Sequence, residues 1–600
     1  MMAKYLGDPC KNFCILASIV ITDPGDRREK LVLSSLVSGG TGRLIFIDTG
    51  NGTGESLTLP GDEGAWALLQ FRDKLLVGTC PQRGYLHCLD MTTRTWARPL
   101  QDENETYIWN LVLGSDDMVY GGTWPGCVLL RYDPNRHILE NMGKMSRQPA
   151  NQYIRMVFSG APGRIFLNCG FPMYAAVWSM ETGKVSFFGR EEAEILEVNE
   201  NFVCTRTGEE LDFYHPITLE LLTGSIRLSD PDSYPREPET PITRFVREMT
   251  HPARDDRLPA DIRPLRLADG SMAGVSGQEY FILKKSDPSV EFKRIPVDAP
   301  SIQILTVTVG SDGTVWGTSA FGQTIFRYEP AGGTCWNSPA VCSRGGEVYG
   351  IRVIGGKVFM SAYSGGDHIV YDPASPWSQR NNLNPVTLRP VHPDLIRPNA
   401  KSVVGPDGAF WTGWMARYGV YGGGLSRVDP GTLAVNFWYD PVPGQGIEAL
   451  ATGSRYLYFT TCGGGNGLPA RTEPLYLCQW DPAGKRLART VKFPEGVLLG
   501  PVETVGMYVA AGINDELYIF DCDTLKMIRS VCLPARCTCL IRFSDAELAV
   551  FCGSQVFLIH PEAGGAELLT SLPGPVRTAA ADGDGILYFA IAEHLYRLEK

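Results

Sequence analysis

The feature that most constrains the fold of this chain is a repeated hairpin motif. Residues 310–330 read GSDGTVWGTSAFGQTIFRYEP, and residues 114–134 read GSDDMVYGGTWPGCVLLRYDP. Each copy has a polar Gly-Ser-Asp turn, a short apolar run, a turn with Gly, and a second apolar run that stops at Arg-Tyr-acid-Pro. Two apolar runs around a Gly turn, ended by Pro, predict a β-hairpin.

Similar hairpins recur along all 600 residues, with starts about 40 to 50 residues apart. Apolar runs before and after most of them supply two more strands, so each unit predicts a four-stranded propeller blade. We count about thirteen units, and propellers close at about four to eight blades. The sequence therefore predicts an all-β fold of tandem β-propellers, two rings of about seven four-stranded blades.

The predicted boundaries follow from this count. Residues 11–300 form the first propeller and residues 301–600 the second, whose last unit, 577–600, has only three strands. Residues 1–10 are expected to supply the missing outer strand and close that ring. The hairpin signal fades near 201–214, is weak at 272–284, and leaves room for one more unit between them.

A Pro-rich excursion at 229–264 interrupts the first propeller, because that many prolines cannot occupy a central strand. It is expected to be a solvated loop, or a linker between the rings, with a short helical stretch at 243–249 capped by Thr243.

The composition limits the classes of partner that the chain is expected to bind. The formal net charge is −11 and the basic residues are scattered, which argues against nucleic acid or an anionic membrane as a partner. The apolar run at 13–21 is too short to span a bilayer and lacks the flanks of a targeting signal, so a buried strand is expected. The 16 cysteines lie mostly in apolar runs, which predicts reduced thiols and a cytoplasmic protein.

The best candidate site lies in the second half, where loops of two consecutive blades should share one rim. Aromatic faces beside Arg, Asn and His suit a saccharide or a carboxylated ring, and a His or Tyr next to an Arg could remove a proton beside a carboxylate. The predicted catalytic residues are His368, His392 and Arg397. The predicted substrate-binding residues are Tyr363, Asn399, Trp414, Arg417 and Tyr418. The alternative is that these are ordinary propeller loop residues.

Other motifs are weaker. The loop at 460–474 is Gly-rich but lacks the Lys-Ser/Thr ending of a phosphate-binding loop, so a lid over the channel is the better interpretation. Cys532, Cys537 and Cys539 lack the usual metal-binding spacing and are expected to be core or loop thiols. The metal ligands are unknown; a divalent metal held by His residues of separate blades, such as His368 and His392, stays open.

The segments GSDGTVWGTS and GPDGAFWTGW, with strand ends RYEP, RYDP and VDP, resemble the repeats of streptogramin-lyase-like and related bacterial β-propellers. The resemblance covers repeats throughout the chain and implies the propeller fold. The lyases of that group are single seven-bladed rings about half this length that use His and a divalent metal to open an ester by elimination. Their catalytic residues do not align with particular positions here.

Two functions of different classes follow. The chain is expected to bind a small polar ligand, a saccharide or uronic-acid-containing glycan, at a propeller rim and to cleave it as a lyase or hydrolase. The alternative is a non-catalytic double-propeller scaffold that presents its rims to protein partners, because aromatic and Arg residues are also enriched at protein interfaces.

Overall fold

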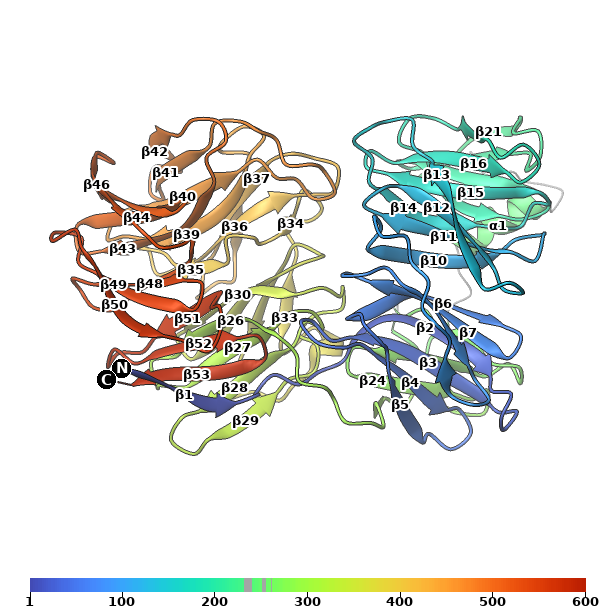
Figure 1. Ribbon diagram of the computed structural model, residues 1–600, viewed down its shortest axis with the longest axis horizontal. Helices are drawn as coiled ribbons and strands as arrows, with labels where there is room; N and C mark the ends of the chain where they lie inside the picture. The colour runs from blue at the N-terminus through green and yellow to red at the C-terminus, as the bar shows by residue number, and fades with distance from the viewer. Residues whose placement is uncertain (231–239, 251–254, 260–261, 600) are drawn as a thin grey trace. The chain divides into compact units, whose positions relative to one another are not determined.

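The computed structural model describes residues 1–230, 240–250, 255–259 and 262–599. These residues form 53 strands, one α-helix and a short 3-10 helix at Gln379–Asn381 (Figure 1). The strands pair into thirteen antiparallel sheets, twelve of four strands and one of five. This architecture agrees with the predicted all-β class and is consistent with β-propeller blades.

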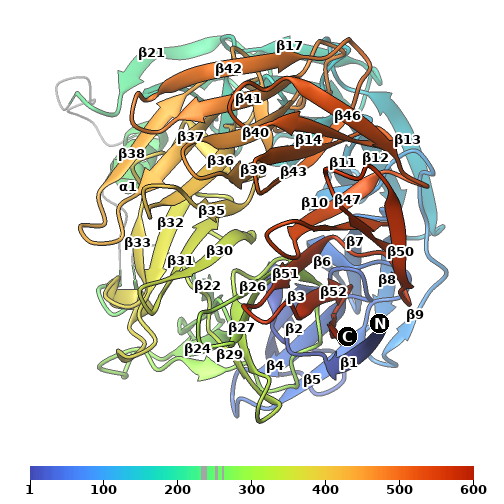
Figure 2. The ribbon, with the colours of Figure 1, turned by 90° about the vertical axis from the view of Figure 1, so that its left-hand side faces the viewer.

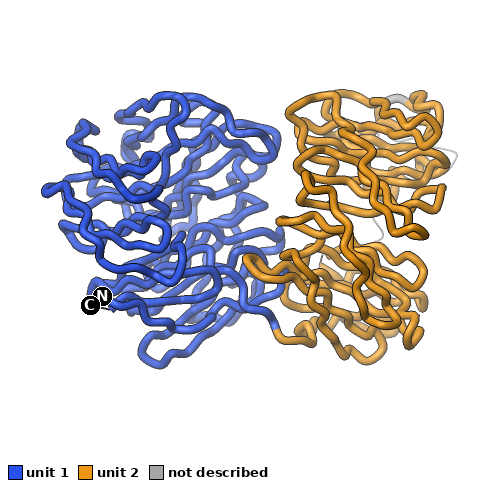
Figure 3. The backbone as a smooth tube through the Cα atoms, viewed as in Figure 1, with its two compact units in different colours: residues 1–14, 299–600 blue, residues 15–298 orange. Residues whose placement is uncertain are grey.

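The chain divides into two compact units (Figure 3). Unit 1 comprises residues 1–14 and 299–600, and unit 2 comprises residues 15–298. Seven of the sheets belong to unit 1 and six to unit 2.

The six sheets of unit 2 follow one another along the chain. They are β2–β5 (Cys14–Thr22, Glu29–Leu36, Arg43–Asp48, Gly54–Thr58), β6–β9 (Gly64–Phe71, Lys74–Cys80, Leu86–Asp90, Thr95–Trp96), β10–β13 (Tyr107–Leu113, Val119–Trp124, Val128–Asp133, Ile138–Lys144), β14–β17 (Tyr153–Phe158, Arg164–Gly170, Tyr174–Ser179, Val185–Phe188), β18–β21 (Glu194–Val198, Val203–Thr207, Glu210–Tyr214, Leu221–Arg227) and β22–β25 (Leu265–Arg266, Met272–Ser276, Glu279–Leu283, Lys293–Arg294).

The seven sheets of unit 1 include the N-terminal strand. They are β26–β29 (Ile304–Val309, Val315–Ser319, Ile325–Glu329, Thr334–Asn337), β30–β33 (Val348–Ile354, Lys357–Ala362, Asp367–Tyr371, Val386–Leu388), β34–β38 (Leu395–Arg397, Ser402–Val404, Phe410–Ala416, Gly423–Val428, Val435–Tyr439), β39–β42 (Gly446–Thr452, Leu457–Cys462, Tyr476–Asp481, Arg486–Lys492), β43–β46 (Leu499–Val505, Tyr508–Ile513, Glu516–Asp521, Met527–Cys532), β47–β50 (Cys537–Arg542, Leu548–Cys552, Gln555–Ile559, Ala566–Ser571) and β51–β53 (Thr578–Ala581, Leu587–Ile591, His594–Glu599) with β1 (Met2–Gly7).

Both copies of the repeated motif form the expected hairpins. Strands β11 and β12 pair across residues 114–134, and β27 and β28 pair across residues 310–330. The N-terminal strand β1 pairs antiparallel with β53, from Met2 opposite Glu599 to Gly7 opposite Leu595. The last sheet of unit 1 therefore joins both ends of the chain.

Unit 2 has six sheets where about seven were predicted. The weak signals at 201–214 and 272–284 are the hairpins β19–β20 and β23–β24. The described residues between β21 and β22 form a helix instead of another sheet, α1 (Pro241–Thr250). Its N-cap is Thr240, whose Oγ1 accepts the N–H of Thr243 at 3.2 Å, so the predicted cap at Thr243 is three residues too late. The rest of the predicted excursion lies partly outside the described residues.

The sheets of unit 1 are arranged around a common centre (Figure 2). We call the first strand of each sheet in chain order its inner strand, except that the inner strand is β35 in the five-stranded sheet and β51 in the sheet that contains β1. The inner strands contact one another in the order β26, β30, β35, β39, β43, β47 and β51, and β51 contacts β26. In unit 2 the sixth sheet contacts the first, because Ala268 donates its N–H to Glu29 Oε1 at 2.9 Å.

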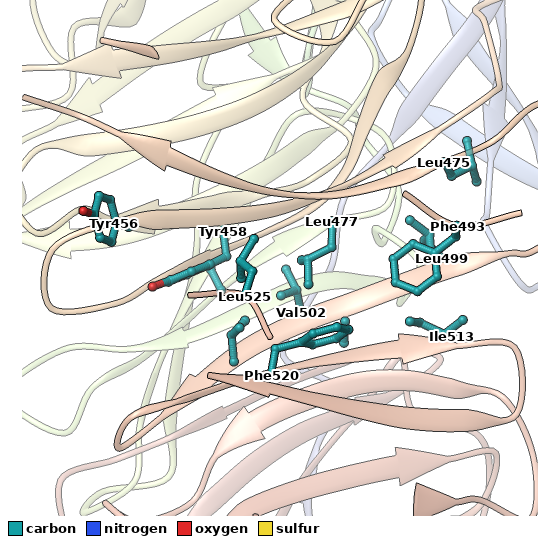
Figure 4. Packing of buried hydrophobic residues seen from close by; sticks show 13 residues of the cluster. Tyr456, Tyr458, Leu475, Leu477, Phe493, Leu499, Val502, Ile513, Phe520 and Leu525 are labelled. Carbon is teal, nitrogen blue, oxygen red and sulfur yellow. The ribbon is translucent and has the colours of Figure 1, made fainter. Parts of the chain in front are cut away.

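The core lies between neighbouring sheets. Figure 4 shows one such layer, in which Leu477 and Tyr458 from one sheet pack against Val502 and Phe520 from the next. Strand residues alternate between the two faces of a sheet, and these strands lie between two neighbours, so both faces carry apolar side chains. Burial of each Leu, Val or Phe contributes about 1.5–3 kcal/mol. This packing holds the loops at the ends of the inner strands in fixed positions.

None of the 16 cysteines forms a disulfide bond in the described structure, and most are buried. Among the described residues, no helix has the length and apolar character needed to cross a membrane.

Candidate functional site in unit 1

A β-bulge marks the start of several inner strands. In β30 the register shifts between Val348 and Gly350, which leaves Tyr349 without a paired residue opposite it. The same shift in β39 leaves Glu448 unpaired. A bulge breaks the strict alternation of side chains and points one side chain in a new direction, which is why bulges are frequent at rims and active sites. Tyr349 and Glu448 are both partly exposed, and each follows a buried residue.

Arg397 lies at the end of β34 and is the centre of the site. Its Nη1 donates to the hydroxyl of Tyr349 at 2.8 Å, and its Nε donates to Asn466 Oδ1 at 2.8 Å. Its guanidinium carbon also lies 4.0 Å from the ring centre of Tyr363. Arg397 Nη2 has no hydrogen-bond acceptor among the residues that the structure describes. This N–H group is available to a ligand.

Two tyrosines complete this side of the cluster. Tyr363 comes from the loop after β31 and Tyr418 from the loop after β36, and their hydroxyl oxygens are 2.5 Å apart. Burial, followed by the neighbouring Tyr418, raises the pKa of Tyr363 well above its usual value. Burial and the nearby Glu347 carboxylate raise the pKa of Tyr349 to about 12, although Arg397 opposes the shift. The hydroxyls of Tyr349 and Tyr363 therefore keep their protons near neutral pH.

Glu347 is the residue that gives the cluster its chemistry. Glu347 is only 6% exposed, and its Oε2 is buried with no hydrogen-bond partner in the described part of the chain. Burial raises the pKa of Glu347 to about 7, with Arg397 acting in the opposite direction. A carboxyl with that pKa is divided between its acid and base forms at neutral pH, which suits proton transfer.

The backbone around Glu347 is fixed by close contacts. Tyr363 donates its N–H to the carbonyl of Glu347 at 2.9 Å. Gly346 precedes it with a φ of +96°, and a Cβ there would lie 2.6 Å from the carbonyl oxygen of Tyr363. Gln323 Nε2 donates to that same oxygen at 2.8 Å. Only glycine fits at position 346, so the approach of Glu347 to Tyr363 is set by the sequence.

A long Gly-rich loop supplies the other anchor of Arg397. Asn466, in the loop after β40, accepts from Arg397 and is itself 5% exposed. Its backbone carbonyl accepts the N–H of Gly419 at 3.0 Å, and Tyr421 donates to the carbonyl of Pro469 at 2.7 Å. The loop was predicted to be a lid. In the structure, its contacts make it part of the wall that positions Arg397.

Four of the eight predicted site residues contribute to this cluster. Arg397, Tyr363 and Tyr418 form it, and Asn399 extends it by donating from Nδ2 to Glu448 Oε2 at 2.9 Å. Arg417 is exposed at the beginning of the same loop as Tyr418. His392 is partly buried in the segment before β34, and no hydrogen bond or ring contact of the described residues joins it to Arg397.

His368 and Trp414 belong to the core and not to the rim, which corrects the sequence prediction. His368 is 1% exposed and Trp414 is fully buried, and their rings are 5.1 Å apart. Both contact the hydroxyl of Ser426, at 2.8 Å and 2.7 Å. Burial lowers the pKa of His368 to about 3, so its ring is neutral. His368 is the second residue of β32, two positions beyond the last residue of the preceding loop.

The sequence prediction missed Glu347 and Asn466. An alignment of the inner strands on the buried residue before each bulge would have indicated Glu347. That alignment places Glu347-Val348-Tyr349 over Tyr107-Ile108-Trp109, Tyr153-Ile154-Arg155 and Gly446-Ile447-Glu448. Asn466 carries no such signal, because its role depends on the path of a long loop.

Comparisons with known proteins do not constrain the chemistry further. No protein-family model matches the chain, and no curated protein is significantly similar to it. Within the described residues, no group of three or more His, Cys, Asp or Glu side chains is arranged to hold a metal ion.

Proposed function

We propose that both units are β-propellers, with seven blades in unit 1 and six in unit 2, and that unit 1 binds an acidic saccharide at Arg397 and cleaves it by β-elimination. The observation that carries this proposal is a buried carboxyl, that of Glu347, close enough to Arg397 to feel its charge; among the described residues, Glu347 Oε2 has no hydrogen-bond partner and Arg397 Nη2 has no acceptor.

Binding follows from the groups around Arg397. A guanidinium binds a carboxylate through parallel N–H donors, and Nη2 and the remaining N–H of Nη1 have no protein acceptor among the described residues. Tyr349 and Tyr363 place their aromatic rings beside the guanidinium, at 6.0 Å and 4.0 Å. Rings next to a cation suit a uronic acid, whose apolar face stacks while its carboxylate pairs with Arg397.

The chemistry is proton removal from the carbon beside the carboxylate. Glu347 in its ionised form takes this proton, and Arg397 stabilises the negative charge that develops on the carboxylate oxygens. The C–O bond at the next carbon then breaks as a C=C bond forms. The departing oxygen takes a proton from a tyrosine hydroxyl of the Tyr363–Tyr418 pair, and Glu347 returns its proton to that pair through solvent. Atoms and charges balance without an oxidant or reductant.

The test is an elimination assay on the purified chain with oligosaccharides of uronic acids, following the absorbance of the new C=C bond conjugated to the carboxylate. Glu347→Gln should lower kcat by about 10²–10⁴-fold, the usual contribution of a general base. Tyr418→Phe tests the proton donor in the same assay.

The matched control is Glu105→Gln in unit 2. Glu105 is also buried, at 3% exposed, but its Oε2 accepts the N–H of Gly126 at 2.9 Å. This change should leave elimination unaltered. Cleavage products without a C=C bond would contradict elimination in favour of hydrolysis. If uronic-acid probes neither bind nor react, the enzyme proposal is wrong and the scaffold alternative gains support.

A further inference from the structure

Unit 2 carries an aromatic cluster at the positions that correspond to the site of unit 1. The bulges of its inner strands leave Trp66, Trp109 and Arg155 unpaired in β6, β10 and β14. Around them lie aromatic residues from the starts of the same strands and from the ends of the next ones. The cluster consists of Trp66, Tyr107, Trp109, Trp124, Tyr153 and Phe171.

The rings form a continuous set of contacts. Tyr107 stacks on Trp109 with ring centres 4.9 Å apart, and the ring centre of Trp66 lies 5.6 Å from that of Trp109. Trp124 meets Tyr107 edge to face at 5.2 Å. These residues come from three neighbouring sheets. The cluster is therefore a surface assembled by the fold and not a local feature of one hairpin.

Part of the cluster is open to solvent. Trp66 is 36% exposed and Met156, next to Arg155, is 41% exposed. The core of unit 2 is already filled elsewhere, since its buried clusters lie between the sheets. Exposed large rings at the rim of a rigid scaffold are typical of a ligand site.

Two polar features indicate the chemistry of the ligand. Arg155 is exposed, lies 5.5 Å from the ring centre of Trp109 and makes no ion pair with the described residues. The indole N–H groups of Trp109 and Trp124 are buried and have no acceptor in the described part of the chain. A ligand oxygen that enters between the rings would supply that acceptor.

The nearby acids are already engaged. Asp62 accepts hydrogen bonds from Thr79 Oγ1 at 2.7 Å and from the N–H groups of residues 82–84. Glu63 accepts from Gln82 Nε2 at 3.1 Å. Arg155, beside the cluster, is an exposed cation with no ion-pair partner among the described residues, and it favours an anionic ligand.

We infer that the aromatic cluster of unit 2 is a second binding site, which holds an acidic saccharide by stacking its rings on Trp66 and Trp109 and pairing its carboxylate with Arg155. Flat faces with N–H donors suit a sugar ring, which has an apolar C–H face and an edge of oxygen acceptors. The cluster has no carboxyl equivalent to Glu347, because that position is Tyr107, so the site binds without cleaving. This inference does not depend on the elimination chemistry proposed for unit 1.

The experiment is isothermal titration calorimetry of the full chain with a short oligosaccharide of galacturonic acid. It is run in an Arg397→Ala background, with Arg397→Lys as the substitute if that variant does not fold, so that unit 1 contributes little binding. Trp66→Ala and Arg155→Ala are then added separately. Both residues are exposed, so their loss should not prevent folding.

Each added change should weaken binding at least about tenfold, which is the effect of losing one good contact. The matched control is Phe437→Ala, which removes an aromatic ring 39% exposed on β38 of unit 1 and should leave binding unchanged. A neutral galactose oligosaccharide of equal length should bind more weakly, because it lacks a partner for Arg155.

Three results would overturn the inference. The first is that the acidic probe shows no saturable binding. The second is that Trp66→Ala and Arg155→Ala bind it as tightly as the background protein, and the third is that the neutral probe binds with the same affinity as the acidic one. A Pro-rich peptide that binds at Trp66 when the saccharides do not would assign the cluster to peptide recognition instead. Loss of elimination in Glu347→Gln with intact binding here would separate the two sites.

Discussion

The sheet β30–β33 of unit 1 and the sheet β10–β13 of unit 2 have a bulge at the same place in the inner strand and carry different side chains around it. Before the bulge stands Glu347 in one and Tyr107 in the other, and at the bulge stand Tyr349 and Trp109. On the neighbouring strand or its loop, Tyr363 hydrogen-bonds to the backbone of Glu347, and Trp124 lies opposite Tyr107. The comparison shows that similar bulges can carry residues of an ionisable cluster in one unit and of an aromatic cluster in the other.

The largest expected effect comes from removing the carboxyl that distinguishes unit 1. Burial raises the pKa of Glu347 from 4.5 to about 7, so the folded protein holds this proton more tightly than the unfolded chain. Unfolding therefore becomes easier as the pH rises from 4.5 through 7. The shift corresponds to about 3 kcal/mol, at one pKa unit per about 1.4 kcal/mol.

The variant Glu347→Gln has no carboxyl at this position, so it does not lose stability in this way as the pH rises. Its free energy of unfolding, relative to the unaltered protein, should rise by about 3 kcal/mol between pH 4.5 and pH 8. Urea denaturation at a series of pH values measures the difference. Glu503 in β43 also has its pKa raised to about 7 by burial, but it is present in both proteins and its effect cancels. A difference that does not change with pH would show that Glu347 titrates normally.

The next effect compares the two rim arginines. Arg397→Ala removes the cation beside a buried carboxyl and leaves Asn466 Oδ1 without its donor. It should cost about 2 kcal/mol of unfolding free energy, and more at pH 8 than at pH 5, because the ionised Glu347 then has no cation. Arg155→Ala in unit 2 should cost about 0.5 kcal/mol, since that side chain is exposed. Equal costs at the two positions would remove the distinction between the rims.

The smallest effect concerns the backbone frame. Gly346→Ala should destabilise the protein by about 1 kcal/mol more than Gly356→Ala. Both glycines have a positive φ, +96° and +78°, but a Cβ meets the carbonyl of Tyr363 only at Gly346 and nothing within 4 Å at Gly356. The difference in unfolding free energy between the two variants therefore measures the effect of the contact, because the backbone strain is common to both. Gly346→Ala should also reduce elimination, and an unchanged rate would show that the position of Glu347 tolerates a shift.

The repeats were readable because each hairpin carries its own turn and stop signals. The copies at 114–134 and 310–330 predicted their strands directly, and the short last unit predicted the pairing of β1 with β53. The number of sheets in unit 2 was less certain, because β22 and β25 have two residues each and leave little apolar pattern.

The site was predicted only in part, for a physical reason. Arg397, Asn399, Tyr363 and Tyr418 occupy strand ends and loops whose position follows from the hairpin pattern. His368 looks like a loop residue in the sequence, but the strand pairs it with Ser361 and turns it into the core. The neighbours of a buried carboxyl cannot be read from local sequence, so only the structure places Arg397 and the Tyr363 loop near Glu347.

The bulge has a consequence for how such a protein changes over time. A bulged residue has no partner across the ladder, so its replacement leaves the neighbouring strand pairs intact. The chain already holds Trp, Arg, Tyr and Glu at positions 66, 109, 155, 349 and 448 on similar backbones. Folding and recognition are thereby encoded by separate residues, and a lineage of these repeats can acquire a new ligand by point substitution while its blades stay the same.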